Sequence, residues 1–238
     1  MAYADLHIHS NFSSDGTARI ETILETVKTQ TNLTILAITD HDEIEGALLA
    51  EKLAPSYGLT SIVGSEVSTS EGHLLALFIR ERIPSGLSLL NTLHYIDDQG
   101  GLCIAPHPGA RFTNSLSLKA IENALHTPIG QKVLVGIEVF NAGIFRLKSN
   151  GMAMNFALHH DIAISANSDA HVTGMIGRAA TGFAGNTIKD LRYALTNRTT
   201  SMFRSYSIKS SYIIFSWLHN KLIVRETRNS SIPATSPA

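Results

Sequence analysis

Seven short apolar segments, separated mostly by stretches with helical spacing, set the strongest constraint on the fold of this chain. They read ADLHIHS, LTILAITDH, LTSIVGSEVS, HLLALFI, GLCIAPHP, VLVGIEVFN and DIAISANSDAH. Short apolar runs of this kind indicate buried strands. Buried strands that alternate with helices are typical of a parallel α/β sheet whose faces are covered by helices.

The segments between these strands carry apolar residues at the spacing of an amphipathic helix. Within residues 18–30 one helical face holds Ile20, Ile23, Leu24 and Val27. The same spacing predicts helices over residues 43–54, 87–98, 117–125, 151–160 and 187–196. The third connection differs, because only about five polar residues separate the third strand from the fourth, which predicts a hairpin or a tight bend.

The length and composition favour one large domain. The chain has 238 residues, of which 44% are hydrophobic and 16% charged, so it can bury a sizeable core. Seven strands in a chain of this length favour a closed or nearly closed barrel over an open sheet. The segment HSNFSSDG follows the first strand, where a dinucleotide or phosphate loop would need glycines. We expect a barrel over residues 1–205 and a carboxyl-terminal extension over 206–238, with about ten disordered residues at its end.

Charge and hydrophobicity limit the partners that we expect. The formal net charge is −1, so no general basic field would attract nucleic acid, and we expect no stable binding to duplexes. The start MAYADLHIHS lacks the features of a signal peptide, and no run reaches the ~18 apolar residues of a spanning helix. The single cysteine, Cys103, rules out an intramolecular disulfide. A cytoplasmic protein without membrane contact is the expectation.

Metal-binding residue types gather where the predicted strands end. Two pairs, His7 with His9 and Asp169 with His171, are spaced so that both side chains of a pair leave a strand on the same face. The carboxyl ends of parallel barrel strands meet on one face, so residues from different strands should share one site. The candidates at or near these ends are His7, His9, Asp40, His41, Glu66, His73, His107, Asp169 and His171.

This mixture of imidazole and carboxylate groups suits zinc, manganese or iron. The absence of a cysteine cluster argues against a structural zinc site. One ion cannot use so many ligands. Two or three ions bridged by a carboxylate such as Glu66 would use them, and such clusters favour phosphoryl displacement.

Six segments in order resemble the polymerase and histidinol phosphatase (PHP) family of metal-dependent phosphoesterases. They are DLHIHSNFSSDG, AITDHD, VGSEVS, GHLLAL, IAPHPG and ISANSDAH, and the resemblance covers residues 3–185. It implies a distorted seven-stranded (β/α)7 TIM-like barrel. It also implies a centre of two or three divalent ions (manganese, zinc or iron) and hydrolysis of phosphate esters by a hydroxide held between ions.

Carried over position by position, the family pattern implies three groups of ligands. The first ion would take His7, His9, Glu66 and Asp169, the second Asp15, His41 and His171, and the third Glu66 as a bridge with His73 and His107. Asp15 stands where many relatives carry histidine, a difference that can change the metal preferred at the second position. His73 depends on how the short third connection folds.

Other polar residues are candidates for supporting roles. Asp40 could orient an imidazole from outside the ligand set, with a structural role at the strand end as its rival. Arg111 and Arg178 could bind a substrate phosphate in a bidentate fork, or lie on the surface. Ser10 and Asn141 could hydrogen-bond the substrate or a ligand carboxylate, or cap backbone groups.

The substrate stays open at this point. A nucleotide or a 5′-phosphorylated oligonucleotide ranks first, another small phosphorylated metabolite second, and histidinol phosphate third. Two other classes compete with a phosphoesterase. Amidohydrolases also place HxH on a first barrel strand, but here no lysine stands at a strand end to bridge two ions. A metal-stabilised module without catalytic activity is the other alternative. The sequence does not define the oligomeric state.

Overall fold

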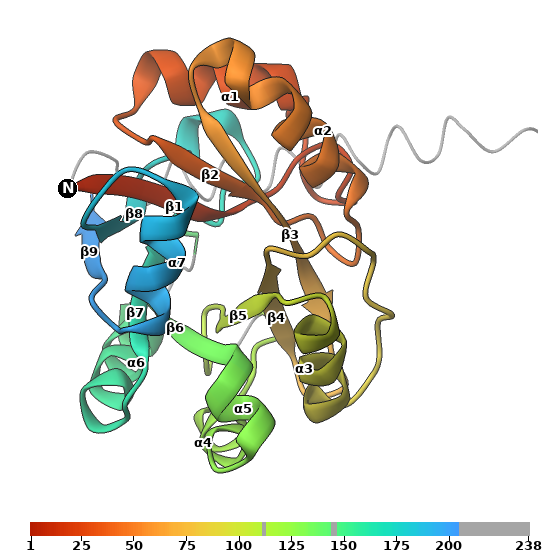
Figure 1. The fold of residues 1–238 in the computed structure, drawn as a ribbon, viewed down its shortest axis with the longest axis vertical. Coiled ribbons are helices and arrows are strands. Elements are labelled where there is room, and N and C mark those ends of the chain that lie inside the picture. The colour runs from red at the N-terminus through yellow and green to blue at the C-terminus, as the bar shows by residue number, and fades with distance from the viewer. Residues whose placement is uncertain (111–112, 144–146, 205–238) are drawn as a thin grey trace, which may run out of the picture.

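A strongly curved sheet lies at the centre of the protein, with helices around it (Figure 1). This computed structural model describes residues 1–110, 113–143 and 147–204. The strands are β1 (Ala2–Ile8), β2 (Ile35–Ile38), β3 (Thr60–Ser68), β4 (His73–Leu77), β5 (Leu102–Ala105), β6 (Leu134–Asn141), β7 (Ala163–Asn167), β8 (Ala179–Phe183) and β9 (Ser201–Arg204).

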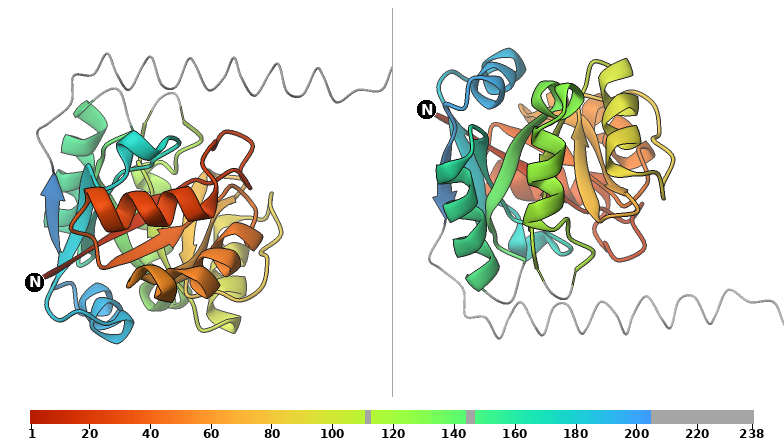
Figure 2. Two further views of the ribbon diagram at one scale, coloured as in Figure 1. Left: turned by 90° about the horizontal axis from the view of Figure 1, so that it is seen from above. Right: turned by 90° about the horizontal axis from the view of Figure 1, so that it is seen from below.

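The helices follow the predicted pattern closely. They are α1 (Ile20–Gln30), α2 (Glu45–Leu53), α3 (Leu89–Asp98), α4 (Leu118–Leu125), α5 (Pro128–Val133), α6 (Leu147–His159) and α7 (Ile188–Thr196), with short 3-10 helices η1 (Ala54–Tyr57) and η2 (Thr173–Met175). Figure 2 shows α1 and α2 on one side of the sheet and α4 and α5 on the opposite side. All six predicted helices are present, and α5 was not predicted.

The order of the strands in the sheet is β7-β6-β5-β4-β3-β2-β1-β8-β9. The pairs β1/β2, β2/β3, β5/β6 and β6/β7 are parallel, whereas β3/β4, β4/β5, β1/β8 and β8/β9 are antiparallel. The predicted hairpin is confirmed, since β3 and β4 pair antiparallel across a connection of four residues, 69–72.

The expected count of seven strands was too low, because the described residues form nine. All seven predicted segments are strands, and β8 and β9 are the additions. β8 reads AATGF, in which small residues give little apolar signal. β9 reads SMFR and lies largely exposed at the edge of the sheet. Neither has the long apolar run by which a buried strand is recognised.

The sheet curves until its two halves meet beside β1, which gives a nearly closed barrel. No continuous ladder joins β7 to β1 or β8, but single hydrogen bonds cross the seam. The backbone N–H of His9 donates to the carbonyl of Ala170 over 2.9 Å, and that of Leu6 donates to Asn167 Oδ1 over 2.9 Å. The barrel therefore closes partly through side chains, and this seam lies next to the predicted site.

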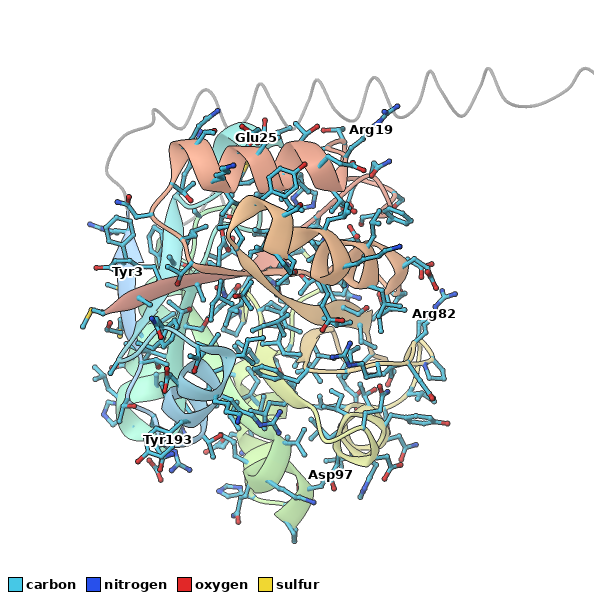
Figure 3. The ribbon with its side chains drawn as sticks, turned by 45° about the horizontal axis from the view of Figure 1, so that its top comes forward. Tyr3, Arg19, Glu25, Arg82, Asp97 and Tyr193 are labelled. Carbon is cyan, nitrogen blue, oxygen red and sulfur yellow. The ribbon has the colours of Figure 1, made fainter. Side chains whose placement is uncertain are left out.

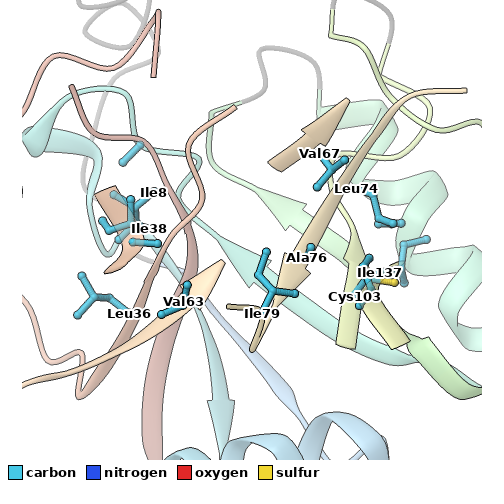
Figure 4. Close-up of a cluster of buried hydrophobic side chains, with 14 of the residues drawn as sticks. Ile8, Leu36, Ile38, Val63, Val67, Leu74, Ala76, Ile79, Cys103 and Ile137 are labelled. Atoms are coloured by element: carbon cyan, nitrogen blue, oxygen red, sulfur yellow. The ribbon is translucent and has the colours of Figure 1, made fainter. Parts of the chain in front are cut away.

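Two hydrophobic clusters divide the core. The larger contains residues of α1–α6 and of the strands that they cover, so it lies between the helices and the sheet; Figure 4 shows part of it, including Ile38, Leu74 and Cys103. The smaller joins strand residues such as Leu6 and Leu75 to Leu191 on α7, so it fills the barrel interior at the end that α7 covers. The polar residues of the barrel collect at the other end.

Several charged and aromatic side chains lie at the periphery of the protein. Arg19 and Glu25 near α1, Arg82 before α3, and Tyr193 on α7 all project outward (Figure 3). Within the described part of the chain, no helix is long and apolar enough to span a membrane. The predicted extension over residues 206–238 lies outside the described residues.

Candidate metal centre

The nine residues predicted as metal ligands come together at one end of the barrel. Overlapping groups of three or four, with ligand atoms within 4.8 Å of one another, connect His7, His9, Asp15, His41, Glu66, His73, His107, Asp169 and His171. The residues belong to β1, β3 and β4 and to the segments that follow β1, β2, β5 and β7. The expected convergence at the carboxyl ends of strands is thus what the fold produces, except that His73 begins β4, which runs antiparallel to its neighbours.

Glu66 stands at the centre of the cluster and divides it into two sets. Its Oε1 lies 2.9 Å from His73 Nδ1 and 3.0 Å from His107 Nε2. Its Oε2 lies 3.1 Å from His7 Nε2, with His9 Nε2 at 3.2 Å and His41 Nδ1 at 3.4 Å. Two oxygens with separate sets of imidazole neighbours are what a carboxylate that bridges two metal ions requires.

His9 provides a direct test of whether a metal ion fits. Its side chain is buried, and neither ring nitrogen has a hydrogen-bond partner among the described residues. Nevertheless Nε2 lies 3.2 Å from Glu66 Oε2 and 3.3 Å from Asp169 Oδ1. Buried polar atoms normally find hydrogen-bond partners, whereas this nitrogen lies beside two carboxylate oxygens, which are themselves donor atoms for a metal ion. The donor set therefore fits a divalent ion of the zinc, manganese or iron kind.

A second group of ligands lies nearer to solvent. Asp15 Oδ2 is 3.1 Å from His171 Nε2 and 3.3 Å from His41 Nε2, and His9 completes the group. The side chain of Asp15 is 43% exposed, whereas that of Glu66 is 1% exposed. Asp15, His41 and His171 are therefore more accessible to solvent than the ligands around Glu66.

Mutual attraction between carboxylates and imidazoles dominates the electrostatics of the site. Burial alone would lower the pKa of His9, but the carboxylates of Asp169 and Glu66 raise that pKa to about 10. Burial likewise would raise the pKa of Glu66, but His7 and His41 hold that pKa well below its usual range. Without an ion, the raised pKa values of His7, His9 and His41 favour protons on these three rings, so metal binding to them would release protons.

Two of the ligand residues have unusual backbone geometry. His107 has a φ of +31° and Asp169 a φ of +51°, in the left-handed region that residues with side chains seldom adopt. Such conformations concentrate at functional sites, where the surrounding structure holds them in place. Each residue stands two positions after the end of a buried strand, so the backbone departs from the strand conformation where it positions a ligand.

Asp40 holds the loop that links His9 to Asp15. Its Oδ1 accepts a hydrogen bond from Ser10 N over 2.6 Å, and its Oδ2 accepts one from Ser10 Oγ over 2.7 Å. Of the two roles considered for Asp40, orienting an imidazole or a structural role at the strand end, these hydrogen bonds to Ser10 correspond to the second. A Cβ at Gly46 would lie 2.5 Å from Asp40 Oδ2, so this pair also depends on a glycine in α2.

Asp5 holds the segment between β7 and β8, which contains the ligands Asp169 and His171. This carboxylate is buried, and it accepts hydrogen bonds from the backbone N–H groups of Ser168 over 3.0 Å and Gly177 over 3.1 Å. Burial raises the pKa of Asp5 to about 6, although these N–H donors oppose the shift. One carboxylate thus fixes both ends of the segment that contains Asp169 and His171.

Sequence reasoning missed Glu138, which lies in the middle of β6. Its carboxylate is fully buried and lies 3.0 Å from His7 Nδ1, so it contacts a ligand from outside the ligand set. Burial would raise the pKa of Glu138, but His7 holds it below its usual value. The available signal was a lone carboxylate within the apolar run VLVGIEVFN. Asn141 in the same run was a candidate for a hydrogen bond to the substrate or to a ligand carboxylate, or for capping, and its Nδ2 donates to Asp169 Oδ2 over 3.1 Å.

Of the two arginines predicted to bind phosphate, the structure describes Arg178 but not Arg111. Arg178 follows the segment held by Asp5, and 9% of its surface is exposed, so it is no ordinary surface arginine. Arg111 lies outside the described residues. Contact of either residue with a phosphate stays a prediction.

Two models of known protein families match this chain, and one of them spans the metal-ligand cluster. A family model described as a PHP domain matches residues 5–171, and a model described as PHP-associated matches residues 148–200. The first match contains all nine residues of the cluster. An uncharacterized protein of Methanocaldococcus jannaschii is 37% identical over 166 residues, which are 66% of this chain and 89% of that protein.

Solved structures with a similar fold confirm the barrel. A two-domain protein from Bacteroides vulgatus, containing a predicted PHP-like metal-dependent phosphoesterase, has a TM-score of 0.69 and 19% identity over 92% of this chain and 69% of that chain. A lesion-specific endonuclease from Pyrococcus furiosus has a TM-score of 0.57 and 18% identity, covering 82% of this chain and 56% of its own. At these identities the likeness concerns the fold.

Proposed function

This chain belongs to the PHP domain family, and from that premise we propose that it is a metal-dependent phosphoesterase whose active site is the nine-residue cluster. The observation that carries the proposal is the division of the imidazoles between the two oxygens of Glu66. A bridging carboxylate of this kind serves sites in which two ions act on one phosphate.

The proposed ligand sets follow the family pattern. His7, His9, Glu66 and Asp169 would hold one ion and Asp15, His41 and His171 a second, while His73 and His107 would share Glu66 with a third. Two observations support this arrangement: Asp15, His41 and His171 form one group with His9, and Glu66 Oε1 contacts both His73 and His107. Manganese, zinc and iron all suit the donors.

Divalent ions bound there would supply Lewis acidity, which lowers the pKa of water and neutralises negative charge on a phosphate. The protein's own residues keep the ligands in place. Asp40 and Ser10 fix the loop that contains Asp15. Asn141 donates to Oδ2 of Asp169, and Oδ1 of the same carboxylate faces His9. Arg178, and Arg111 outside the described residues, would add charged hydrogen bonds to a substrate phosphate.

A nucleotide or a short 5′-phosphorylated oligonucleotide is the substrate class that we favour, ahead of other small phosphorylated metabolites. The side chain of Asp15 is 43% exposed, so this ligand is accessible to a phosphate from solvent. Support also comes from the endonuclease of Pyrococcus furiosus, which has the same fold. Histidinol phosphate, and a metal-stabilised module without activity, are the competing readings that the experiment below distinguishes.

The test is a hydrolysis screen with manganese-loaded and zinc-loaded protein. Substrates are a 5′-mononucleotide, a short 5′-phosphorylated oligonucleotide and histidinol phosphate, with release of phosphate and of mononucleotides measured separately. His9→Ala should abolish turnover, whereas His94→Ala, at an exposed position on α3, should leave it unchanged. Turnover of histidinol phosphate alone would correct the substrate. No turnover of any ester by protein that binds metal would favour the non-catalytic module.

A further inference from the structure

Glu138 is a buried carboxylate whose oxygens are surrounded by nitrogen donors. Oε1 lies 3.0 Å from His7 Nδ1 and accepts from Asn167 Nδ2 over 2.8 Å. Oε2 accepts from the backbone N–H of His107 over 2.8 Å and from Asn141 Nδ2 over 2.9 Å. The residue is fully buried in β6. Four donors use the four acceptor positions of a carboxylate, so no other side chain of similar size could satisfy them.

The contact with His7 decides which nitrogen of that ring can bind a metal ion. Because a carboxylate only accepts hydrogen bonds, the proton of neutral His7 stays on Nδ1. In that neutral form, which is the one that binds a metal ion, Nε2 carries no proton, and it faces Glu66 Oε2 at 3.1 Å and Asp169 Oδ1 at 3.4 Å. A carboxylate that accepts a hydrogen bond from the other ring nitrogen of a ligand imidazole orients the ring and typically strengthens metal binding.

The other oxygen of Glu138 reaches two more ligands. It accepts from the backbone N–H of His107, whose φ of +31° needs support, and the Nε2 of that ring lies 3.0 Å from Glu66 Oε1. It also accepts from Asn141 Nδ2, which donates at the same time to Asp169 Oδ2. The side chain of Asp169 is thereby turned so that Oδ1 faces His7 and His9.

We propose that Glu138 is the positioning residue of the metal centre, which sets the orientation of His7, His107 and Asp169 together. This proposal depends on one part of the proposed function, namely that the cluster binds metal ions. Glu138 stays outside the ligand set: its oxygens face Nδ1 of His7, the nitrogen away from Glu66, and the backbone of His107.

Glu138→Gln is the sharpest variant, because it keeps the shape and replaces one acceptor oxygen by a donor. If the amide nitrogen faces His7, the ring must accept through Nδ1 and carry its proton on Nε2, where it blocks the metal. If the amide nitrogen faces His107, it opposes the backbone N–H and the Asn141 donor. Glu122→Gln, on α4 and paired with Lys119, is the matched control.

The measurement is the affinity of metal-free protein for manganese and for cobalt alone, by competition with a chelator, at a temperature where each apoprotein is fully folded by circular dichroism. We expect Glu138→Gln to bind about 10- to 100-fold more weakly, with a changed visible spectrum of the cobalt form, and Glu122→Gln to match the wild type. A lower thermal midpoint of the apoprotein with unchanged affinity and spectrum would show a merely structural role and overturn the proposal.

If Glu138→Gln does not fold, Glu138→Asp replaces it, since a shorter carboxylate keeps the charge but cannot reach both pairs of donors. Unchanged metal affinity in that variant would overturn the proposal. The readout also separates this inference from the proposed function. Wild-type protein that binds metal and hydrolyses no ester would contradict the function alone, whereas wild-type protein that binds no metal would contradict both.

Discussion

At the scale of single residues, His9 shows how the site exchanges protons for metal. The ring is buried between two carboxylates, and in the absence of an ion they raise its pKa from 6.5 to about 10. The same carboxylates and the same Nε2 would be ligands in the loaded protein. A proton and a metal ion therefore compete for one position, and the pH dependence of the two forms should differ.

Stability of the metal-free protein should fall as the pH rises from about 6.5 to about 10. A folded-state pKa above the unfolded value means that the native state binds the extra proton, so the stabilisation is complete below pH 6.5 and is lost through this window. Each such proton changes the free energy of unfolding by about 1.4 kcal/mol per pH unit. Denaturant unfolding with a chelator present should show this slope, and His9→Gln should reduce it. Equal slopes in both proteins would contradict the assignment.

At the scale of elements, the sequence was most informative where a strand is buried on both faces. The seven apolar segments are strands, and most of the cluster lies at or just past their carboxyl ends, because period and burial are local properties; His73, which begins β4, and Asp15, which lies in the loop after β1, are the exceptions. β8 was missed since its sequence, AATGF, consists mostly of small residues, although all five are buried. Glu138 was missed because its role depends on His7 and His107, which are 131 and 31 residues away along the chain.

The junction between α2 and the loop after β1 gives a test at this scale. In Gly46→Ala the new Cβ would lie 2.5 Å from Asp40 Oδ2 and 2.9 Å from Ser10 Oγ, two atoms that hydrogen-bond each other. Asp40 cannot move aside without losing that bond and the one from Ser10 N. We expect a loss of about 1–3 kcal/mol in the free energy of unfolding, with weaker metal binding, because the loop also positions Asp15.

Gly151→Ala on α6 is the matched control for that variant. A Cβ there would have no heavy atom within 4 Å, so only helix propensity changes. Alanine should stabilise this helix by about 0.5–1 kcal/mol relative to glycine. Thermal unfolding of both variants would give opposite shifts. A stabilised Gly46→Ala protein with normal metal affinity would show that the contact between α2 and Asp40 is unimportant.

At the scale of the whole molecule, the barrel interior is apolar at the end covered by α7 and ionic at the other end. Ligands from residue 7 to residue 171 meet at that ionic end. They lie beside the seam where individual hydrogen bonds, rather than a continuous ladder, connect the β1 segment to the β7 segment. Ions bound there would connect segments that the sheet itself does not join. Metal binding should therefore support the closed barrel as well as catalysis, since ligand binding to the native state adds to its stability.

The most direct test of this account is the number of metal ions per chain, measured by plasma mass spectrometry on protein purified without chelators or an affinity metal. The account predicts two or three manganese, zinc or iron ions per chain, and a clear reduction in Asp169→Ala. Fewer than one ion per chain, with no recovery after the protein is loaded with manganese or zinc, would contradict the shared metal centre.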